Sequence, residues 1–175
     1  MTRIILFSIG LFVFQTLSAQ DDSSYVVLDG DTVLYEHIEV ETEYTQIDSM
    51  VETAREYLGV KYKVGGCSSS GFDCSGFLYY CAQQLSIDIP RASYVQAAAG
   101  DYIEADSLQA GDFIFFNGRN IASGAVGHVA MVTEVIDGAI KIIHATSSRG
   151  VMEEVLQQNS YFMQRWIYNK RLLEE

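Results

Sequence analysis

The stretch GFDCSGFLYYCAQQL, from Gly71 to Leu85, places a cysteine directly after an aspartate and at the start of a periodic apolar run. The apolar positions that recur at helical spacing are Leu78, Cys81, Ala82 and Leu85. Such spacing predicts a helix with a buried face. Cys74 is therefore expected in the first turn of a buried helix.

A cysteine in that position is a candidate nucleophile. The first N–H groups of a helix have no partner within the helix, and together with the helix macrodipole they stabilise an anion. Such surroundings can lower the pKa of a cysteine from about 8.5 into the range of roughly 3.5 to 7.5. We therefore expect Cys74 to supply a thiolate at neutral pH.

The residues before Cys74 predict a loop and, further upstream, a helix. Residues 65–71 are rich in glycine and serine, which favours a loop in which the backbone can approach a ligand closely. Ser49 and Glu52 form a capping-box pattern, and Gly59 is placed to end the helix. A short amphipathic helix is expected to lead into the domain.

A thiolate nucleophile needs a base, and two histidines follow it in GHVAMVTEVIDGAIKIIHATS. His128 and His144 stand at the outer ends of two β-prone runs, and Asp137 and Gly138 mark a turn between these runs. The two runs are predicted to pair as a hairpin. A single histidine on a strand is more often structural than catalytic, so a catalytic role depends on whether the two histidines share a face.

The turn type decides that question, because residues on one face of paired strands keep even offsets. A two-residue loop of Asp137 and Gly138 would send His128 and His144 to opposite faces. A three-residue loop that also includes Ile136 would make them diagonal neighbours. We expect the three-residue loop, with His128 as the base and His144 as the group that orients it.

The N-terminal part of the chain indicates export. Residues 1–20 have the pattern of a secretory signal peptide, because an arginine precedes an apolar run that ends in small residues. This run is shorter than the about 20 apolar residues that a membrane-spanning helix needs. Residues 21–47 form an acidic extension, in which a small hairpin around Asp29 and Gly30 and a loosely packed solvated segment are both open. Residues 48–175 form the expected catalytic domain, so we expect a periplasmic or secreted protein with no membrane span after signal removal.

The charge of the chain excludes one class of partner. The net charge is −12, and eleven acidic residues against one basic residue lie in residues 21–56. A strongly acidic chain repels phosphate backbones, and no basic stripe interleaved with aromatic residues is present. Nucleic acid is therefore not expected as a partner.

Five motifs give the sequence a resemblance to a known family. In order along residues 50–172 they are YKVGGCSSSGFDCSGF, IPRASYVQ, LQAGDFIFF, GHVAMV and IIHATSSRGV. Together they resemble the NlpC-like family of bacterial cell-wall cysteine peptidases, which are similar to a reduced papain. The resemblance implies a papain-like α+β fold, with a nucleophile helix packed against an antiparallel β-sheet.

The resemblance also implies the roles of individual residues. By motif position, Cys74, His128 and His144 match the catalytic cysteine, the catalytic histidine and the third polar residue. Further residues fall in motifs that line the substrate groove or stand beside the nucleophile: Tyr62, Asp73, Ser75, Arg91 and Ser93. Asp73 and Ser75 are candidates for binding the free amino terminus of the first alanine in a peptidoglycan stem peptide. The chain departs from the family pattern in having Cys67 and Cys81.

These observations predict a secreted cysteine endopeptidase that hydrolyses peptidoglycan stem peptides through an acyl-enzyme. The resemblance points to the bond between the γ-carboxyl of D-glutamate and the following diamino acid. Carboxylates on such a substrate call for arginine, and the candidates are Arg91, Arg119 and Arg149. Two alternatives stay open: an N-acetylmuramoyl-L-alanine amidase on the same fold, and a catalytically silent wall-binding domain. We expect a monomer.

Neither a cofactor nor a metal is expected. A zinc site would draw on the three cysteines and two histidines, but a spacing of seven residues between cysteines is not that of a structural zinc motif. Cys74 and Cys81 are about 10.5 Å apart by helical rise, beyond the roughly 6.8 Å limit between the Cα atoms of a disulfide. Cys81 is expected to be a free buried residue, with a bridge to Cys67 as the alternative in an oxidising compartment.

Overall fold

The computed structural model describes residues 25–28, 31–34 and 45–173. The predicted signal peptide lies outside these residues. The chain divides into two compact units, Met1–Glu43 and Tyr44–Glu175. Each unit is described by itself.

The first unit contains a small antiparallel hairpin. Strand β1 (Tyr25–Leu28) pairs with β2 (Asp31–Leu34), with Leu28 opposite Asp31. This register leaves two residues between the strands, as a turn at Asp29 and Gly30 predicts. The hairpin alternative is therefore the one that the structure adopts.

The second unit is built on a six-stranded antiparallel sheet with the strand order β5-β10-β6-β7-β8-β9. Its strands are β5 (Asp101–Ile103), β6 (Phe113–Asn117), β7 (Val126–Ile136), β8 (Ala139–Thr146), β9 (Gly150–Val155) and β10 (Trp166–Arg171). The three strands β7, β8 and β9 follow one another directly in the sequence. The segment that carries both histidines is thus a meander within the sheet.

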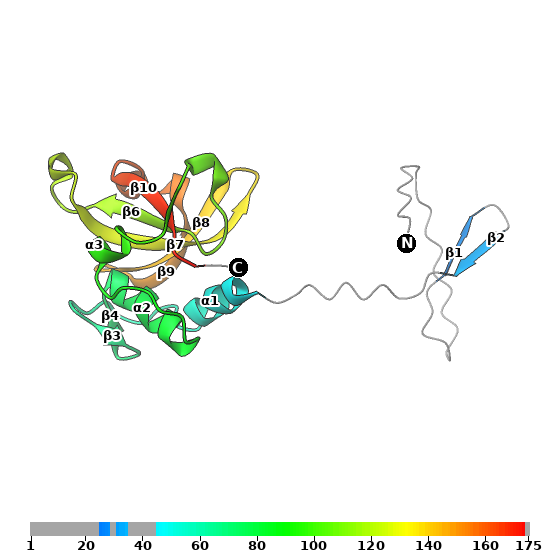
Figure 1. The fold of residues 1–175 in the computed structure, drawn as a ribbon, viewed down its shortest axis with the longest axis horizontal. Coiled ribbons are helices and arrows are strands. Elements are labelled where there is room, and N and C mark those ends of the chain that lie inside the picture. The colour runs from blue at the N-terminus through cyan, green and yellow to red at the C-terminus, as the bar shows by residue number, and fades with distance from the viewer. Residues whose placement is uncertain (1–24, 29–30, 35–44, 174–175) are drawn as a thin grey trace. The chain divides into compact units, whose positions relative to one another are not determined.

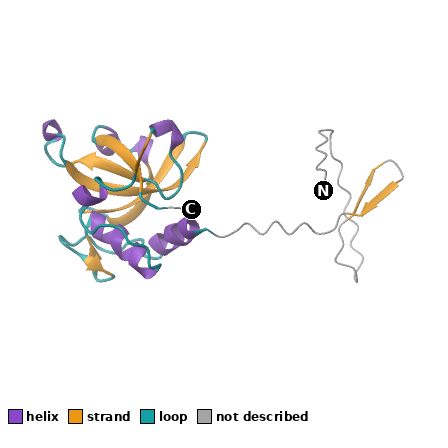
Figure 2. Cartoon of the chain, viewed as in Figure 1, coloured by secondary structure: helices purple, strands orange, loops and turns teal. Residues whose placement is uncertain are grey.

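Two longer helices, α1 (Gln46–Arg55) and α2 (Cys74–Gln84), lie side by side beneath this sheet (Figures 1 and 2). The shorter helices are α3 (Ser93–Gln96), α4 (Ser160–Met163), η1 (Ala105–Ser107), η2 (Ile121–Ser123) and η3 (Leu156–Gln158). A helix that begins at Cys74 and packs on an antiparallel sheet confirms the expected α+β class. Within the described residues, each helix is too short or too polar to cross a membrane.

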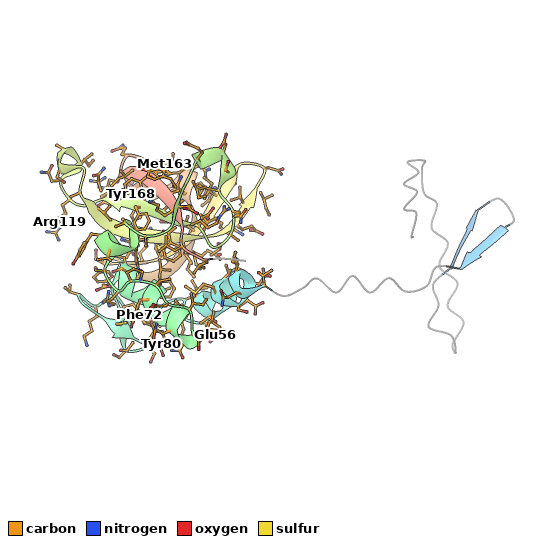
Figure 3. All side chains as sticks on the ribbon, in the orientation of Figure 1. Glu56, Phe72, Tyr80, Arg119, Met163 and Tyr168 are labelled. Atoms are coloured by element: carbon orange, nitrogen blue, oxygen red, sulfur yellow. The ribbon has the colours of Figure 1, made fainter. Side chains whose placement is uncertain are left out.

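The central strands bury side chains on both faces of the sheet. Odd-numbered residues such as Phe115 and Val129 pack with α1 and α2, and Phe72 and Tyr80 lie on this helical side in Figure 3. Even-numbered residues such as Phe116 pack in a second cluster on the other face. This arrangement follows from the two-residue period of a strand and explains the continuous apolar run in β6.

The predicted start of α1 is wrong by a few residues. Thr45, rather than Ser49, is the N-cap, and its side chain accepts the N–H of Asp48 at 3.1 Å. The Asp48 carboxylate accepts the N–H of Thr45 in return at 2.9 Å. A shorter acid can therefore close the capping box in place of Glu52. The helix begins two residues before the expected domain boundary at residue 48.

The predicted loop before Cys74 contains a small hairpin of its own. Strand β3 (Cys67–Ser68) pairs with β4 (Gly71–Phe72), and Tyr62 bridges to Phe72. The hairpin ties the glycine-rich segment to the beginning of α2. It therefore limits how far the backbone in front of the nucleophile can move.

Candidate active site

The beginning of α2 holds Cys74 in place. Asp73 is the N-cap, and its carboxylate accepts the N–H of Gly76 at 2.7 Å. This bond satisfies one of the donors that every helix leaves unpaired at its start. Gly76 has no room for a side chain, because a Cβ there would collide with the Gly66 carbonyl and the Arg91 guanidinium. Cys74 is thus the first residue of a tightly capped helix, and its side chain is buried.

The predicted substrate contacts around the nucleophile bond mainly to one another. Arg91 donates to both Asp73 oxygens, at 3.0 and 2.8 Å, and also to the Ser75 hydroxyl at 3.2 Å. It reaches the Gly66 carbonyl at 3.1 Å as well. The Asp73 carboxylate is therefore occupied by the protein's own groups. In this geometry Asp73, Ser75 and Arg91 support the start of α2, and their contacts with substrate stay a prediction.

The expected lowering of the Cys74 pKa is wrong. Burial raises the pKa of the Cys74 thiol, and the neighbouring Asp73 carboxylate raises it further. Backbone N–H groups, including that of Val129, act in the opposite direction without outweighing burial. The thiol is only 8% exposed, so a thiolate would lose most of its hydration. Cys74 therefore needs a neighbouring base to take its proton.

Strand β7 carries His128, the candidate for that base. The backbone N–H of Val129, the residue that follows His128 on β7, lies close enough to the Cys74 thiol to lower its pKa. On the neighbouring strand, His144 Nδ1 lies 3.0 Å from His128 Nε2. The use of Nε2 for this contact leaves Nδ1 of His128 as the nitrogen available to a thiol. The structure thus joins His128 directly to His144, whereas Cys74 approaches strand β7 at Val129, the residue that follows His128.

The two histidines share a face, but the predicted three-residue loop is wrong. Ile136 pairs with Ala139, so the turn has two residues, and both Asp137 and Gly138 have positive φ as a type I′ turn requires. The register then shifts between Val132 and Glu134, where a β-bulge leaves Thr133 as the extra residue. That single residue restores the even offset that the histidines need. The Asp-Gly pair, which is typical of a two-residue turn, predicted the turn better than the parity of the histidines did. No feature of the sequence predicted the bulge.

Burial determines the ionisation of His128. Burial, and secondly the neighbouring His144, lower the pKa of His128 to about 3. The imidazole is therefore neutral and ready to accept a proton when the thiol is also neutral. Once Cys74 becomes a thiolate, its charge favours the imidazolium, so the two groups are expected to titrate as a pair.

Glu154, which the sequence did not single out, completes the polar chain. His144 is fully buried, and its Nε2 lies 3.0 Å from Glu154 Oε1. His144 pairs across the strands with Met152, so Glu154 is a diagonal neighbour on the same face. The same even-offset argument that paired the histidines would have found this carboxylate if it had been extended to the next strand.

Phe162 of α4 covers the two imidazoles. Its ring stacks on His128 with centroids 5.0 Å apart and an angle of 27° between the planes, and it lies 4.8 Å from His144. An apolar cover of this kind keeps water away from the contact between the histidines. It also explains why burial dominates the pKa of His128.

A pocket of about 540 Å³ opens beside His128. The residues that line it are Tyr62, Val64, Asn117, Gly118, Arg119, Gly127, His128, Ala145, Thr146, Ser147, Ser148, Arg149, Asn159, Tyr161 and Phe162. Of the five predicted substrate contacts, Tyr62 belongs to this lining, whereas Ser93 begins α3 outside it. Two of the three candidate arginines, Arg119 and Arg149, also line it, and Arg119 lies at the periphery of the domain in Figure 3.

The cysteines form no disulfide with one another. All three cysteines are free, and Cys81 is fully buried, as expected. Cys67 directs its sulfur at the Gly76 carbonyl, 3.5 Å away. Over the part of the chain that the structure describes, no group of three or more His, Cys, Asp or Glu residues is arranged to hold a metal ion.

Comparison with known proteins gives a family match and several relatives. The NlpC/P60 family matches residues 59–171. The gamma-D-glutamyl-L-lysine dipeptidyl-peptidase of Bacillus subtilis (strain 168) is 34% identical over 125 residues, which cover 71% of this chain and 38% of that protein. The murein DD-endopeptidase MepS/murein LD-carboxypeptidase of Escherichia coli (strain K12) is 29% identical over 120 residues, covering 67% of this chain and 58% of that protein.

A solved structure shows the same fold. The NlpC/P60 family protein from Bacillus cereus ATCC 10987 has a TM-score of 0.66 and 30% sequence identity. The match covers 90% of this chain and 53% of that protein. The chain thus spans well under half the length of the dipeptidyl-peptidase and about half the length of this solved relative.

Proposed function

Because the chain belongs to the NlpC/P60 family, whose papain-like α+β fold it shares, we propose that it is a cysteine endopeptidase acting on peptidoglycan stem peptides. The observation that carries this proposal is the 3.0 Å contact between His128 and His144, on strands that pack against the helix that begins at Cys74. A silent binding domain has no need of this chain of proton-transferring groups. The pocket next to His128 gives a peptide room to reach them.

The geometry supports acyl transfer through a thioester. His128 accepts the Cys74 proton at Nδ1, and the sulfur attacks the scissile carbonyl carbon. The unpaired N–H groups at the start of α2 are suited to stabilise the resulting oxyanion. His128 then gives its proton to the leaving amine, and water, deprotonated by the same imidazole, hydrolyses the acyl-enzyme.

For the bond cleaved, we propose the link between the γ-carboxyl of D-glutamate and the following diamino acid. The name of the Bacillus subtilis relative specifies a γ-D-glutamyl bond, whereas that of the Escherichia coli relative specifies a different one. The pocket supplies the guanidinium groups of Arg119 and Arg149 for the free carboxylates of such a substrate. Arg149 also pairs with Glu154, but it lines the pocket, whereas Arg91 pairs with Asp73 outside the lining and is not assigned this role.

We further propose that the protein works in the periplasm or outside the cell after removal of residues 1–20. The apolar run that follows Arg3 and the location of a cell-wall substrate support this proposal. N-terminal sequencing of the exported protein checks it. A mature chain that still begins at Met1 would contradict it.

The proposed activity is tested by digesting a free tripeptide or tetrapeptide stem and the same stem attached to its muramyl sugar. We expect the free stem to yield a dipeptide and a fragment that begins with the diamino acid, identified by mass spectrometry. Cys74→Ala is expected to abolish this cleavage while its circular dichroism spectrum stays that of the parent protein. Comparison of the two substrates also reports whether a free amino terminus is required.

Two outcomes would contradict the proposal. Release of an intact stem from the sugar would replace the endopeptidase by the amidase. Near-normal turnover by Cys74→Ala would remove Cys74 as the nucleophile. If neither substrate is cleaved by the parent protein, the wall-binding alternative gains support.

A further inference from the structure

Glu154 lies at the end of the polar chain that runs from His128 through His144. Its Oε1 is 3.0 Å from His144 Nε2, and its Oε2 accepts from Arg149 Nη2 at 3.0 Å. Asn159 donates its side-chain N–H to Oε1 at 2.9 Å. The carboxylate is thus held from three directions, by β8, by the turn between β8 and β9, and by the start of α4.

The side chains around Glu154 keep it ionised. The His144 imidazole, whose Nε2 makes a close contact with the carboxylate that is not aligned as a hydrogen bond, lowers the pKa of Glu154 to about 2, with further contributions from Arg149 and Asn159. An ionised carboxylate can only accept hydrogen bonds. The proton of a neutral His144 is therefore stabilised on Nε2, and its Nδ1 becomes an acceptor.

This constraint extends to His128. The contact between His144 Nδ1 and His128 Nε2 then requires the proton to lie on His128 Nε2. A neutral His128 with its proton on Nε2 carries its lone pair on Nδ1, the nitrogen left for the thiol. The opposite tautomers would leave the base without an acceptor site for the Cys74 proton.

We propose that Glu154 is a positioning residue, which fixes the tautomer of His144 and, through it, the nitrogen at which His128 accepts the thiol proton. This inference rests on the proposed peptidase function. It gives Arg149 a second role, since its guanidinium lines the pocket and also holds the carboxylate.

Asn159 connects the same carboxylate to the cover of the site. Its side-chain oxygen caps α4 by accepting the N–H groups of Tyr161 and Phe162. Phe162 in turn stacks on His128. The Asn159 side chain therefore holds both Glu154 and α4 in place beside the two imidazoles.

The first test reads the tautomers directly and needs no substrate. In protein labelled with ¹⁵N-histidine, long-range ¹H–¹⁵N spectra at neutral pH distinguish protonated from unprotonated ring nitrogens. We expect both His128 and His144 to carry the proton on Nε2 in the unsubstituted protein. We expect Glu154→Ala to show mixed tautomers at His144. A proton on Nδ1 of His144 in the unsubstituted protein would overturn the proposal, whatever the variants do.

The second test reads catalysis. Glu154→Ala is expected to lower kcat/KM about 10- to 100-fold, the usual cost of losing a group that orients a ligand or catalytic imidazole. We expect the loss in kcat rather than in KM, and partial recovery in Glu154→Gln, whose side-chain oxygen can still accept. The rate at which iodoacetamide labels Cys74, followed by mass spectrometry, should fall in Glu154→Ala together with kcat. This measurement needs no substrate.

The matched control is Glu153→Gln. Glu153 is the preceding residue on β9, and its carboxylate pairs with Arg55 at 2.8 Å. It also accepts from the Thr133 hydroxyl at 2.6 Å, a bond that the side-chain oxygen of glutamine can still accept. We expect this variant to keep its kcat and its histidine tautomers. Equal losses in the Glu153 and Glu154 variants would show a general effect on β9 and overturn the proposal. The expected tautomers in a protein without peptidase activity would instead overturn the proposed function alone.

Discussion

The Cys74 thiol lies where two electrostatic effects oppose each other. The N–H groups at the start of α2 favour the thiolate, while burial and the Asp73 carboxylate disfavour it and together raise the pKa of the thiol. The Asp73 charge is partly balanced by Arg91, which pairs with it at 2.8 Å. Residue identity and helix position were therefore sufficient to propose Cys74 as the nucleophile, but its ionisation depends on neighbours from other segments.

The two histidines have different roles and should respond differently to substitution. We expect His128→Ala to lower kcat/KM by about 10²- to 10⁴-fold, since it removes the base and acid of both steps. His144→Gln should cost only about 10- to 100-fold, because the glutamine oxygen can still accept from His128 Nε2. Steady-state kinetics on the free stem peptide measures both. Equal losses in two folded variants would show that the roles are wrongly assigned.

At the scale of elements, β7 depends on two features that its apolar pattern does not reveal. One is the bulge at Thr133, whose hydroxyl donates to Glu153 Oε1 at 2.6 Å and so ties the bulge to β9. The other is the close approach of Gly118 and Gly127 at the start of the strand. The strand's register, and with it the face that His128 occupies, results from both.

Gly127 is expected not to tolerate a side chain. A Cβ there would collide with the Gly118 backbone, which cannot move aside as a flexible side chain could. We expect Gly127→Ala to lower the free energy of unfolding by about 1 to 3 kcal/mol and to lower kcat/KM, because His128 is the next residue.

The matched control for this strand is Gly118→Ala. A Cβ at Gly118 would meet the Gly127 Cα at 3.6 Å, which is ordinary contact. Chemical denaturation should therefore place Gly118→Ala within about 0.5 kcal/mol of the parent protein. Unfolding free energies that are the same for both variants would refute the steric explanation.

At the scale of the whole molecule, the fold places the three cysteine thiols in different environments. Cys81 is fully buried in the helical core, Cys74 begins the same helix, and the Cys67 sulfur is directed at the Gly76 carbonyl. We expect thiol titration of the mature protein, unfolded without reductant, to find three free groups. A count of one would instead indicate the bridge between Cys67 and Cys81.

The sequence by itself determined the components of this protein. Apolar spacing after Cys74 predicted a buried helix that begins at the nucleophile, and the run from His128 to His144 predicted a hairpin. Five motifs predicted the family and with it the α+β class, both of which are confirmed. These features could be read because each depends on residues that are close together in the chain or on a fixed order of short motifs.

The tertiary structure alone decided how those components meet. Three features depend on groups from different segments: the ion pair of Arg91 with Asp73, the raised pKa of Cys74, and the contact of Glu154 with His144. A fourth, the bulge at Thr133, corrects a mismatch in register between β7 and β8. Local pattern does not encode such pairings, because a buried charge or a strand register depends on every group that packs around it. The sequence therefore pointed to Cys74 and the two histidines as candidates, and the pairing of β7, β8 and β9 decided which of their neighbours face one another.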